Sequence, residues 1–353
     1  MNACNGSSGV RLSDFRCHPA IFSKMEMQFS PFLSATFGIF IMQQIAFFRV
    51  TGMHCCLTGL EGTFTNFEIP AEVEGHPVTG IEGTGCDTLE ELVLPEGIEY
   101  IDGREAISGE KLTRMNFPAS LRRITGDHAL PNQLEALELN EGLEELGSDT
   151  TYGSIRVKSL TIPSTLKKLP HRFMCNGIAC PYFIVSEGIT EIGYNVLDWT
   201  GYVQYVYLPA SLEKIESDFL RDDWEDRMIH IYTQPDSVGA QWAEEKGYVW
   251  VPCDDPADMP RPELQHEDGF TYALVEGEAV IFEYDGDQAD VVVPEVLGNC
   301  PVTRVEYDAF DSNTSLRSLR FPNTLRRLAD FAIWNCTQLE ALYIPVKKIG
   351  INS

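Results

Sequence analysis

The sequence LEELVLPEGIEYI, residues 89–101, carries its apolar side chains at an uneven spacing. The gaps between them are three, two, four and three residues: Leu89, Leu92, Leu94, Ile98 and Ile101. Neither the helical period nor strict alternation accounts for this spacing over the whole stretch. A short strand that ends at Pro95, followed by a return segment, accounts for it when both turn their apolar side chains into one core.

The same pattern recurs along the chain, as in a repeat architecture. After LVLPEGIEYI, related decamers begin at Met115, Leu137, Leu160, Phe183, Val206 and Leu319. Six units place their proline-position residues at intervals of 23, 22, 23, 23 and 23: Pro95, Pro118, Asn140, Pro163, Ser186 and Pro209. Leucine-rich repeats have periods of about 20–29 residues, and their stacked strands and return segments share one core. The sequence therefore predicts a strand-rich α/β repeat solenoid.

A longer similarity divides the solenoid into two arrays. Residues 46–81 align without a gap to residues 270–305, so the same opening unit occurs twice. We predict a first array over residues 46–252 and a second array over residues 269–353.

Residues 237–251, SVGAQWAEEKGYVWV, predict the end of the first array. Ser237 suits the N-cap of a helix that runs to about Lys246, and Gly247 suits its C-terminal stop. The following YVWV indicates a last strand, and together these elements would cover the final core layer. Residues 253–268, rich in proline and aspartate, predict a stiff linker. The second array has no comparable closing segment and is expected to be truncated.

The N-terminal segment, residues 1–45, contains the apolar run FSPFLSATFGIFIM at residues 29–42. Basic residues precede the run, as in a signal peptide, but the lead-in is long, Pro31 interrupts the run and no small-residue cleavage site follows. The run is also shorter than the roughly 18 residues of a helix that spans a bilayer. Three interpretations stay open: an atypical export signal, a membrane-associated segment, and a segment outside the fold. Residues 29–48 are the only stretch through which we expect membrane association.

Acidic residues outnumber basic residues by 53 to 26, which gives a formal net charge of -27. A chain of this charge repels nucleic acid and anionic lipid surfaces. We therefore expect no nucleic-acid partner.

No constellation of catalytic or metal-ligating residues stands out. The common nucleotide-binding, hydrolase and metalloprotease motifs are missing from the sequence, and its ten cysteines form no CxxC pair. MHCC at residues 53–56, with Cys175 and Cys180, could ligate zinc, but apolar residues align with Cys55 and Cys56 in the second copy, which favours packing. The acids of residues 285–290 lack the glycine and the distal glutamate of a calcium loop. We expect no enzyme activity, no cofactor and no metal site.

These features resemble the BspA-like leucine-rich repeat family of bacterial surface proteins. The resemblance is carried by the LxxLxLPxxLxxI units, by DFAIWNCTQL at residues 330–339, by the opening PVT unit and by the closing AQWAEEKGYVWV. It covers about residues 46–252 and 269–345. It implies a secreted or surface-attached protein that acts in adhesion or protein binding, and therefore an extracellular or cell-surface location. The Ala-Phe and Cys positions of the family are poorly matched in the first array, where DGREAISGEKL and SDTTYGSIRV stand.

In a leucine-rich repeat, the strand side chains between the inward residues face outward together on one open surface. In two neighbouring units this surface is predicted to carry an aromatic and apolar patch: Tyr182, Ile184, Tyr205 and Tyr207. Tyrosine is frequent in interface hot spots, so we predict that a protein or another surface macromolecule binds there. The alternative is that these residues only pack across strands or lie under the closing unit.

The sequence leaves three functions to distinguish. The favoured one is a non-catalytic repeat protein that binds a macromolecule at the cell surface through its strands. The second is a structural spacer or stalk of a larger surface protein, with no ligand of its own. The third, an enzyme, requires catalytic residues that the repeat positions do not supply.

Overall fold

The computed structural model describes residues 8–11, 44–151, 157–174, 178–198, 202–216, 218–221, 229–329 and 331–345. Its contacts divide the chain into two compact units. Unit 1 comprises Met1–Gly177 and Gly188–Leu197, and unit 2 comprises Ile178–Glu187 and Asp198–Ser353. Unit 2 therefore joins the last strands of the first array to the second array, which differs from the predicted boundary after residue 252.

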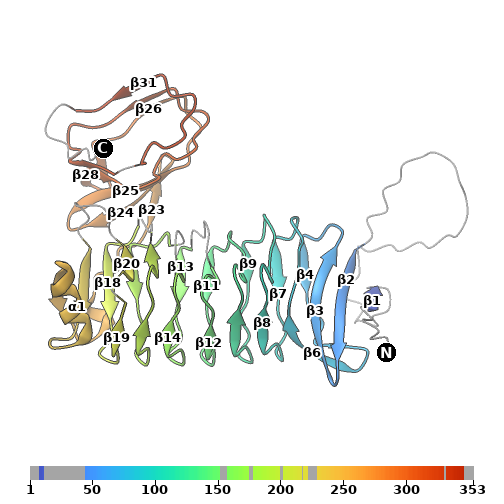
Figure 1. Cartoon of the computed structure of the whole chain (residues 1–353). Coiled ribbons are helices and arrows are strands. Elements are labelled where there is room, and N and C mark those ends of the chain that lie inside the picture. Colours follow the sequence, from blue (N-terminus) through green and yellow to red (C-terminus); the bar gives the residue numbers. More distant parts are fainter. Residues whose placement is uncertain are drawn as a thin grey trace, which may run out of the picture. The chain divides into compact units, whose positions relative to one another are not determined.

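Unit 1 opens with an antiparallel hairpin of β2 (Ile45–Thr51) and β3 (His54–Glu61), and β1 (Ser8–Arg11) pairs with the free side of β2. From β3 onward, equivalent strands of successive turns lie side by side (Figure 1). One parallel ladder continues from β3: β6 (His76–Ile81), β8 (Tyr100–Asp102), β10 (Arg123–Thr125) and β12 (Glu145–Leu146). In later turns β14 (Lys168–Leu169) pairs with β16 (Glu191–Ile192). Near the start of the unit, the short β5 (Glu72–Val73) comes just before β6 and pairs with it in the antiparallel sense.

A second set of strands holds the leucine-rich cores of the repeats, and we call its outward surface the strand face. In unit 1 these strands form two parallel groups: β4 (Asn66–Glu68), β7 (Glu91–Val93) and β9 (Arg114–Met115), then β11 (Ala136–Glu138) and β13 (Ser159–Thr161). The five apolar residues of the stretch at residues 89–101 are all buried in this unit. The predicted solenoid is therefore confirmed.

The turns of the first array are held in register by side chains that reach the next turn. The carboxylate of Glu96 accepts hydrogen bonds from the backbone N–H groups of Ala119 (3.1 Å) and Ser120 (3.2 Å). Glu141 accepts one from the N–H of Ser164 (3.1 Å) in the same way. Glu-Gly turns alternate along the sequence with turns that carry Ser or Thr. Each such pair satisfies backbone donors that would otherwise require water.

In unit 2 the last strands of the first array form one parallel sheet: β15 (Tyr182–Ile184), β18 (Tyr205–Leu208), β21 (His230–Thr233) and β22 (Val249–Pro252). Two further short strands of this unit are β19 (Lys214–Ile215) and β20 (Leu220–Arg221), and β17 (Leu197–Asp198) spans the sequence boundary of the units.

The predicted closing helix is α1 (Val238–Lys246). The Ser237 side chain accepts a hydrogen bond from the N–H of Ala240 (3.1 Å), and Gly247 ends the helix in the left-handed conformation with φ 79°. Trp242 is buried and stacks on Tyr248 with ring centroids 5.2 Å apart. The predicted cap is confirmed. α1 is the one α-helix among the described residues, so strands and turns build the solenoid.

The second array repeats the opening unit of the first. β24 (Phe270–Val275) and β25 (Glu278–Tyr284) form its hairpin. Its other strands beyond residue 285 are β26 (Asp290–Val292), β27 (Val296–Leu297), β28 (Cys300–Val305), β29 (Ser318–Arg320), β30 (Arg327–Leu328) and β31 (Ala341–Tyr343). A separate core of apolar side chains fills this array.

The segment predicted as a linker, residues 253–268, is partly packed. Cys253 and Met259 are buried, and a short 3-10 helix, η2 (Pro256–Asp258), lies between them. β23 (Gln265–Glu267) pairs with β24, so the sheet of the second array begins before residue 269. The proline-rich composition predicts a stiff linker, but it does not reveal that buried apolar residues anchor the segment.

The apolar run at residues 29–42 lies outside the described residues. Of the stretch expected to allow membrane association, residues 44–48 are described, and Ala46 and Phe48 are buried in the protein core. Within the part of the chain that the structure describes, no helix is both long enough and apolar enough to cross a bilayer.

Candidate functional site

The structure brings together the four residues of the predicted aromatic patch. β15 and β18 are parallel neighbours, and their register pairs Tyr182 with Tyr205 and Ile184 with Tyr207. The next strand, β21, places Tyr232 beside Tyr207. These five residues form one continuous surface in unit 2, which we call the tyrosine face.

The tyrosine face is covered by the chain itself. Tyr205 is only 3% exposed and Tyr207 is completely buried. The covering side chains belong to the hairpin of the second array and to the segment before it: Ala273, Val275, Val280, Phe282, Cys253, Met259 and Leu264. Since these side chains are apolar, the hydrophobic effect is the main force that holds the second array there.

A ring stack and a hydrogen bond fix how the second array lies on the last turns of the first array. The rings of Tyr202 and Phe282 stack with centroids 4.7 Å apart and an interplanar angle of 12°. Nη1 of Arg304 donates a hydrogen bond to Oε1 of the buried Gln204 (2.9 Å). A hydrogen bond that crosses an apolar contact sets its register more sharply than apolar packing does, because its geometry is narrow.

The phenol groups of the tyrosine face are structural. The Tyr207 hydroxyl donates to the backbone carbonyl of Asp254 (3.2 Å). Burial raises the pKa of Tyr207 to about 12. Burial, and then the charge of Glu276, raises the pKa of Tyr205 to about 12 as well. Both phenols therefore stay protonated at neutral pH and act as packing surface and hydrogen-bond donors.

The predicted site at Tyr182, Ile184, Tyr205 and Tyr207 has to be revised. The residues lie together, but the second array occupies the surface on which a separate partner was expected. The covering strands do not belong to the closing unit, which was one part of the alternative prediction. The other part, packing across strands, is present between Tyr205 and Tyr232, whose ring centroids lie 5.9 Å apart. The alignment of the two opening units marks only a difference between the hairpins, since Phe282 stands where the first copy has the polar Thr58, and it does not say which surface Phe282 covers.

The strand face of unit 1 lies exposed or half-exposed. Its outward side chains are mainly small or charged: Asn66, Glu68, Glu91, Val93, Arg114, Asn116, Ala136, Glu138, Ser159 and Thr161. A hollow of about 210 Å³ lies over β7 and β9, where Nη2 of Arg114 is 3.4 Å from Oε2 of Glu91. The side-chain amide of Asn116 bonds to the backbone N–H and carbonyl of Leu94 (2.7 and 2.8 Å), which fixes one wall of the hollow.

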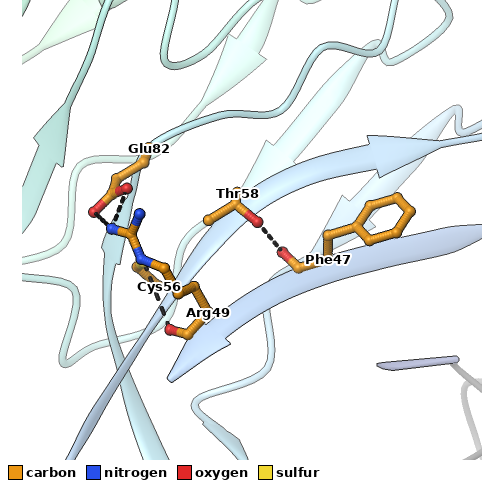
Figure 2. A network of polar contacts seen from close by, with 5 residues as sticks. All are labelled: Phe47, Arg49, Cys56, Thr58 and Glu82. Atoms are coloured by element: carbon orange, nitrogen blue, oxygen red, sulfur yellow. Dashed lines mark hydrogen bonds and ion pairs between the residues drawn. The ribbon is translucent and has the colours of Figure 1, made fainter. Parts of the chain in front are cut away.

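A polar network on the hairpin of unit 1 places the thiol of Cys56 near the charged groups of Arg49 and Glu82. Figure 2 shows the guanidinium of Arg49 directed at the carboxylate of Glu82, beside the thiol of Cys56. Sγ of Cys56 donates to the Arg49 carbonyl (3.7 Å), and the Thr58 hydroxyl donates to the Phe47 carbonyl (3.2 Å). Burial, and then the charge of Glu82, raises the pKa of the Cys56 thiol. Such a thiol is a poor nucleophile, so we interpret the network as hairpin packing.

The candidate metal sites of the sequence do not assemble in the described residues. There, no group of three or more His, Cys, Asp or Glu side chains is placed to hold a metal ion. Cys55, Cys56 and Cys180 are free and buried, and Cys175 lies outside the described residues. In the acidic turn at residues 285–290, Oδ1 of Asp285 lies 3.1 Å from Nε2 of His266.

A solenoid of short stacked strands with a period of about 23 residues is the architecture of a leucine-rich repeat protein. The model of the BspA type leucine rich repeat region matches residues 82–133, 103–223 and 289–353, in six copies. The matched residues make up more than half of the chain, which belongs to the BspA-type leucine-rich repeat family. Repeats of this family are generally non-catalytic. No curated protein matches the chain.

Three solved structures are similar to the chain. A leucine rich cell surface protein from Faecalibacterium prausnitzii A2-165 shares 17% identity at a TM-score of 0.36, covering 85% of this chain and 75% of its own. The pneumococcal vaccine antigen PcpA shares 16% at 0.38, covering 87% and 70%. The leucine rich repeat protein TpLRR of T. pallidum shares 16% identity at a TM-score of 0.34, covering 63% of this chain and 100% of its own. At these TM-scores the likenesses carry no argument of their own.

Proposed function

We propose that the chain is a non-catalytic binding protein located at the bacterial cell surface or outside the cell. Its strand face in unit 1 would hold a protein or another surface macromolecule. The observation that supports the proposal is the difference between the two strand faces. The tyrosine face of unit 2 is covered by the chain itself, whereas the strand face of unit 1, over β4 to β13, presents its outward side chains to solvent.

The composition of the open face favours hydrogen-bonded recognition. Serine, threonine, asparagine and glutamate supply donors and acceptors, and Val93 adds an exposed apolar contact. Polar rims around a few apolar contacts are common in specific interfaces. The hollow over β7 and β9 offers a recess for one projecting side chain of the partner.

A spacer or stalk is the second candidate function. The observation that favours it is the covered tyrosine face, because it joins the two arrays in one compact unit. A stalk must transmit position from one end to the other, and docked arrays do so better than arrays on a loose linker. A spacer requires no ligand, and this separates it from the proposed binding protein.

The test compares three proteins in pull-downs from bacterial-surface and host extracts. The first is the full chain, and the second carries Ser159→Arg and Thr161→Arg, which block the exposed face of β13. The third is a matched control with Gln133→Arg and Ser148→Arg, two exposed turn positions of the same unit. Equal unfolding midpoints establish that all three are folded.

A partner that the chain and the control retain, and that the β13 variant loses, is the expected result. Equal capture by all three proteins would move the contact away from the strand face. Capture of no partner by any of them would favour the spacer.

A further inference from the structure

One turn position of the solenoid carries a left-handed residue in turn after turn. Except for one, the residues at this position are polar or charged: Glu105, His128, Asp149, Arg172, Asn195 and Asp308. The exception is Phe331, 23 residues after Asp308, with a φ of 54°. A bulky aromatic residue seldom adopts this conformation. Its presence in a turn therefore calls for a reason other than local backbone preference.

Phe331 and Trp334 form an exposed aromatic pair at this turn. Phe331 is 41% exposed and Trp334 is 58% exposed. Their rings meet edge to face with centroids 5.0 Å apart, and Phe331 also contacts the ring of Tyr307 at 5.7 Å. Both side chains therefore leave a large aromatic surface in contact with solvent, beside the contacts that they make within the array.

The neighbouring turn places carboxylates beside the aromatic pair. The N–H of Phe310 donates to the carbonyl of Ala332 (2.7 Å), and the N–H of Ser312 donates to the carbonyl of Trp334 (3.0 Å). These bonds stack the turn of Asp308 and Asp311 directly against the turn of Phe331 and Trp334, about 4.8 Å away.

A second acidic turn continues the row. The N–H of Tyr284 donates to the carbonyl of Ala309 (2.7 Å), and the side chain of Asn313 donates to the carbonyl of Gly286 (3.0 Å). The adjoining turn therefore adds the exposed Asp285 and Asp287, the first two acids of the DGDQAD sequence. One edge of the second array thus carries two acidic turns that lead to an aromatic turn.

We propose that this edge binds an extended polypeptide segment rich in Lys or Arg. We call it the acidic–aromatic strip, and it consists of Asp285, Asp287, Asp308, Asp311, Phe331 and Trp334. Carboxylates attract the cationic side chains, and the faces of exposed aromatic rings bind ammonium and guanidinium groups by cation–π contact. The chain already makes such a contact in the same array, where the Arg320 guanidinium lies 4.2 Å from the centroid of the Tyr343 ring.

The strip is a site separate from the strand face of unit 1. Its charge suits one class of partner, because clustered acids repel anionic surfaces and attract basic ones. An aromatic pair without the acids would fit any apolar partner, and acids without the aromatic pair would bind any cation weakly. The combination selects basic side chains that are long enough to lie across a ring.

The probe is a fluorescent peptide of alternating Lys and Gly, titrated with the full chain and followed by fluorescence anisotropy at low and at physiological salt. One variant combines Phe331→Asn with Trp334→Ser, and Asn suits the left-handed turn better than Phe does. The other combines Asp308→Asn with Asp311→Asn. We expect each variant to bind about tenfold more weakly than the unchanged chain.

The two variants should differ in their salt dependence, which separates the two parts of the strip. Loss of the carboxylates should flatten the salt dependence, because fewer charge contacts remain to be screened. Loss of the rings should weaken binding at both salt concentrations and leave that dependence unchanged. An aromatic variant that binds the peptide as tightly as the unchanged chain would overturn the proposal.

The matched control combines Glu105→Gln with Glu110→Gln, two exposed acids on turns of unit 1. It removes the same charge as the aspartate variant, so it should change affinity by less than about twofold if binding is local. An equal loss in the control would show that the peptide responds to the charge of the whole chain, and the strip would be rejected. These outcomes leave the pull-down on the strand face of unit 1 unaffected.

Discussion

The two copies of the opening unit share their strands but differ in the surface that each presents. The hairpin β2–β3 and the hairpin β24–β25 carry β-bulges at aligned positions, after Phe47 in the one and after Thr271 in the other. The strand that pairs in parallel with the hairpin is β6 in the first copy and β28 in the second, again at aligned positions. Inward residues such as Leu57 and Ile281 are buried in both copies.

The side chains on the other surface of the hairpins do not match. The first copy has Arg49, Thr51, Cys56 and Thr58, where the second copy has Ala273, Val275, Val280 and Phe282. In the second copy these four residues lie on the tyrosine face. Inward residues therefore specify the opening unit, whereas the other surface is adapted to what the hairpin contacts.

A fifth aligned position shows the same rule with a polar contact. The first copy has Gly80, and a Cβ built there would lie 2.1 Å from Cζ of Tyr100. The second copy has Arg304, which reaches Gln204 in the first array. Glycine is required where a ring of the same unit lies against the strand, and arginine is present where another array lies against it.

The largest effect is expected from giving the second hairpin the residue of the first, by Phe282→Thr. This change removes a buried ring that stacks on Tyr202. The free energy of unfolding should fall by about 3–5 kcal/mol, measured by denaturant unfolding. The reverse change, Thr58→Phe, falls on a half-exposed residue and should cost less than about 1 kcal/mol. Equal costs for the two changes would contradict the comparison.

A smaller loss is expected from Ala273→Arg, which introduces the charged residue of the first copy. Ala273 is buried against the tyrosine face, so the longer side chain should overpack the contact and cost about 1–3 kcal/mol. Limited proteolysis between residues 253 and 264 should become faster as the second array loosens. As a control, Arg49→Ala removes a largely exposed ion pair with Glu82 and should cost at most about 1 kcal/mol. Unchanged proteolysis of the Ala273 variant would count against the contact.

The hydrogen bond of Tyr207 should contribute less than the apolar contact. Tyr207→Phe keeps the ring and removes the hydroxyl that donates to the Asp254 carbonyl. We expect a loss of about 0.5–1.5 kcal/mol in denaturant unfolding. A loss as large as that of Phe282→Thr would mean that polar contacts, and not the rings, hold the arrays together.

Tyrosine ionisation should have no effect at neutral pH and should act only in alkaline solution. Unfolded tyrosines ionise near pH 10, whereas burial raises the pKa of Tyr205 and Tyr207 to about 12. Their contribution to stability is therefore complete below about pH 10 and is lost as the pH rises through about 12. Absorbance at alkaline pH should show late-ionising tyrosines, and Phe282→Thr should move part of that absorbance change to lower pH. Ionisation of all tyrosines near pH 10 would contradict the covered face.

The repeat, the two opening units and the closing helix could be predicted because each depends on residues that are close in the sequence. Leu92 and Leu94 alternate on one strand, and Ser237 and Gly247 mark the ends of one helix. The adjacency of Tyr182 and Tyr205 also followed, because strands one period apart are neighbours in a solenoid.

The periodicity did not predict whether the predicted site at the tyrosine face is exposed or buried. Whether the tyrosine face is free depends on contacts between residues far apart in the chain, such as Tyr207 with Asp254, 47 residues away, and Gln204 with Arg304, 100 residues away. A repeat pattern states which side chains face outward, but it does not state which outward surfaces meet. The apolar residues from Ala273 to Phe282 carried that information only once the structure had placed them on the tyrosines.

The amino-acid pattern therefore established a strand-built solenoid of BspA-type repeats with two opening units and one closing helix, because a period of about 23 residues fixes inward and outward positions locally. The tertiary structure determined which outward surfaces are buried by other parts of the chain and which stay exposed to solvent. Burial of the tyrosine face, exposure of the strand face in unit 1 and the acidic–aromatic strip all arise from how distant turns pack, since apolar surfaces are buried wherever a complementary surface of the same chain reaches them.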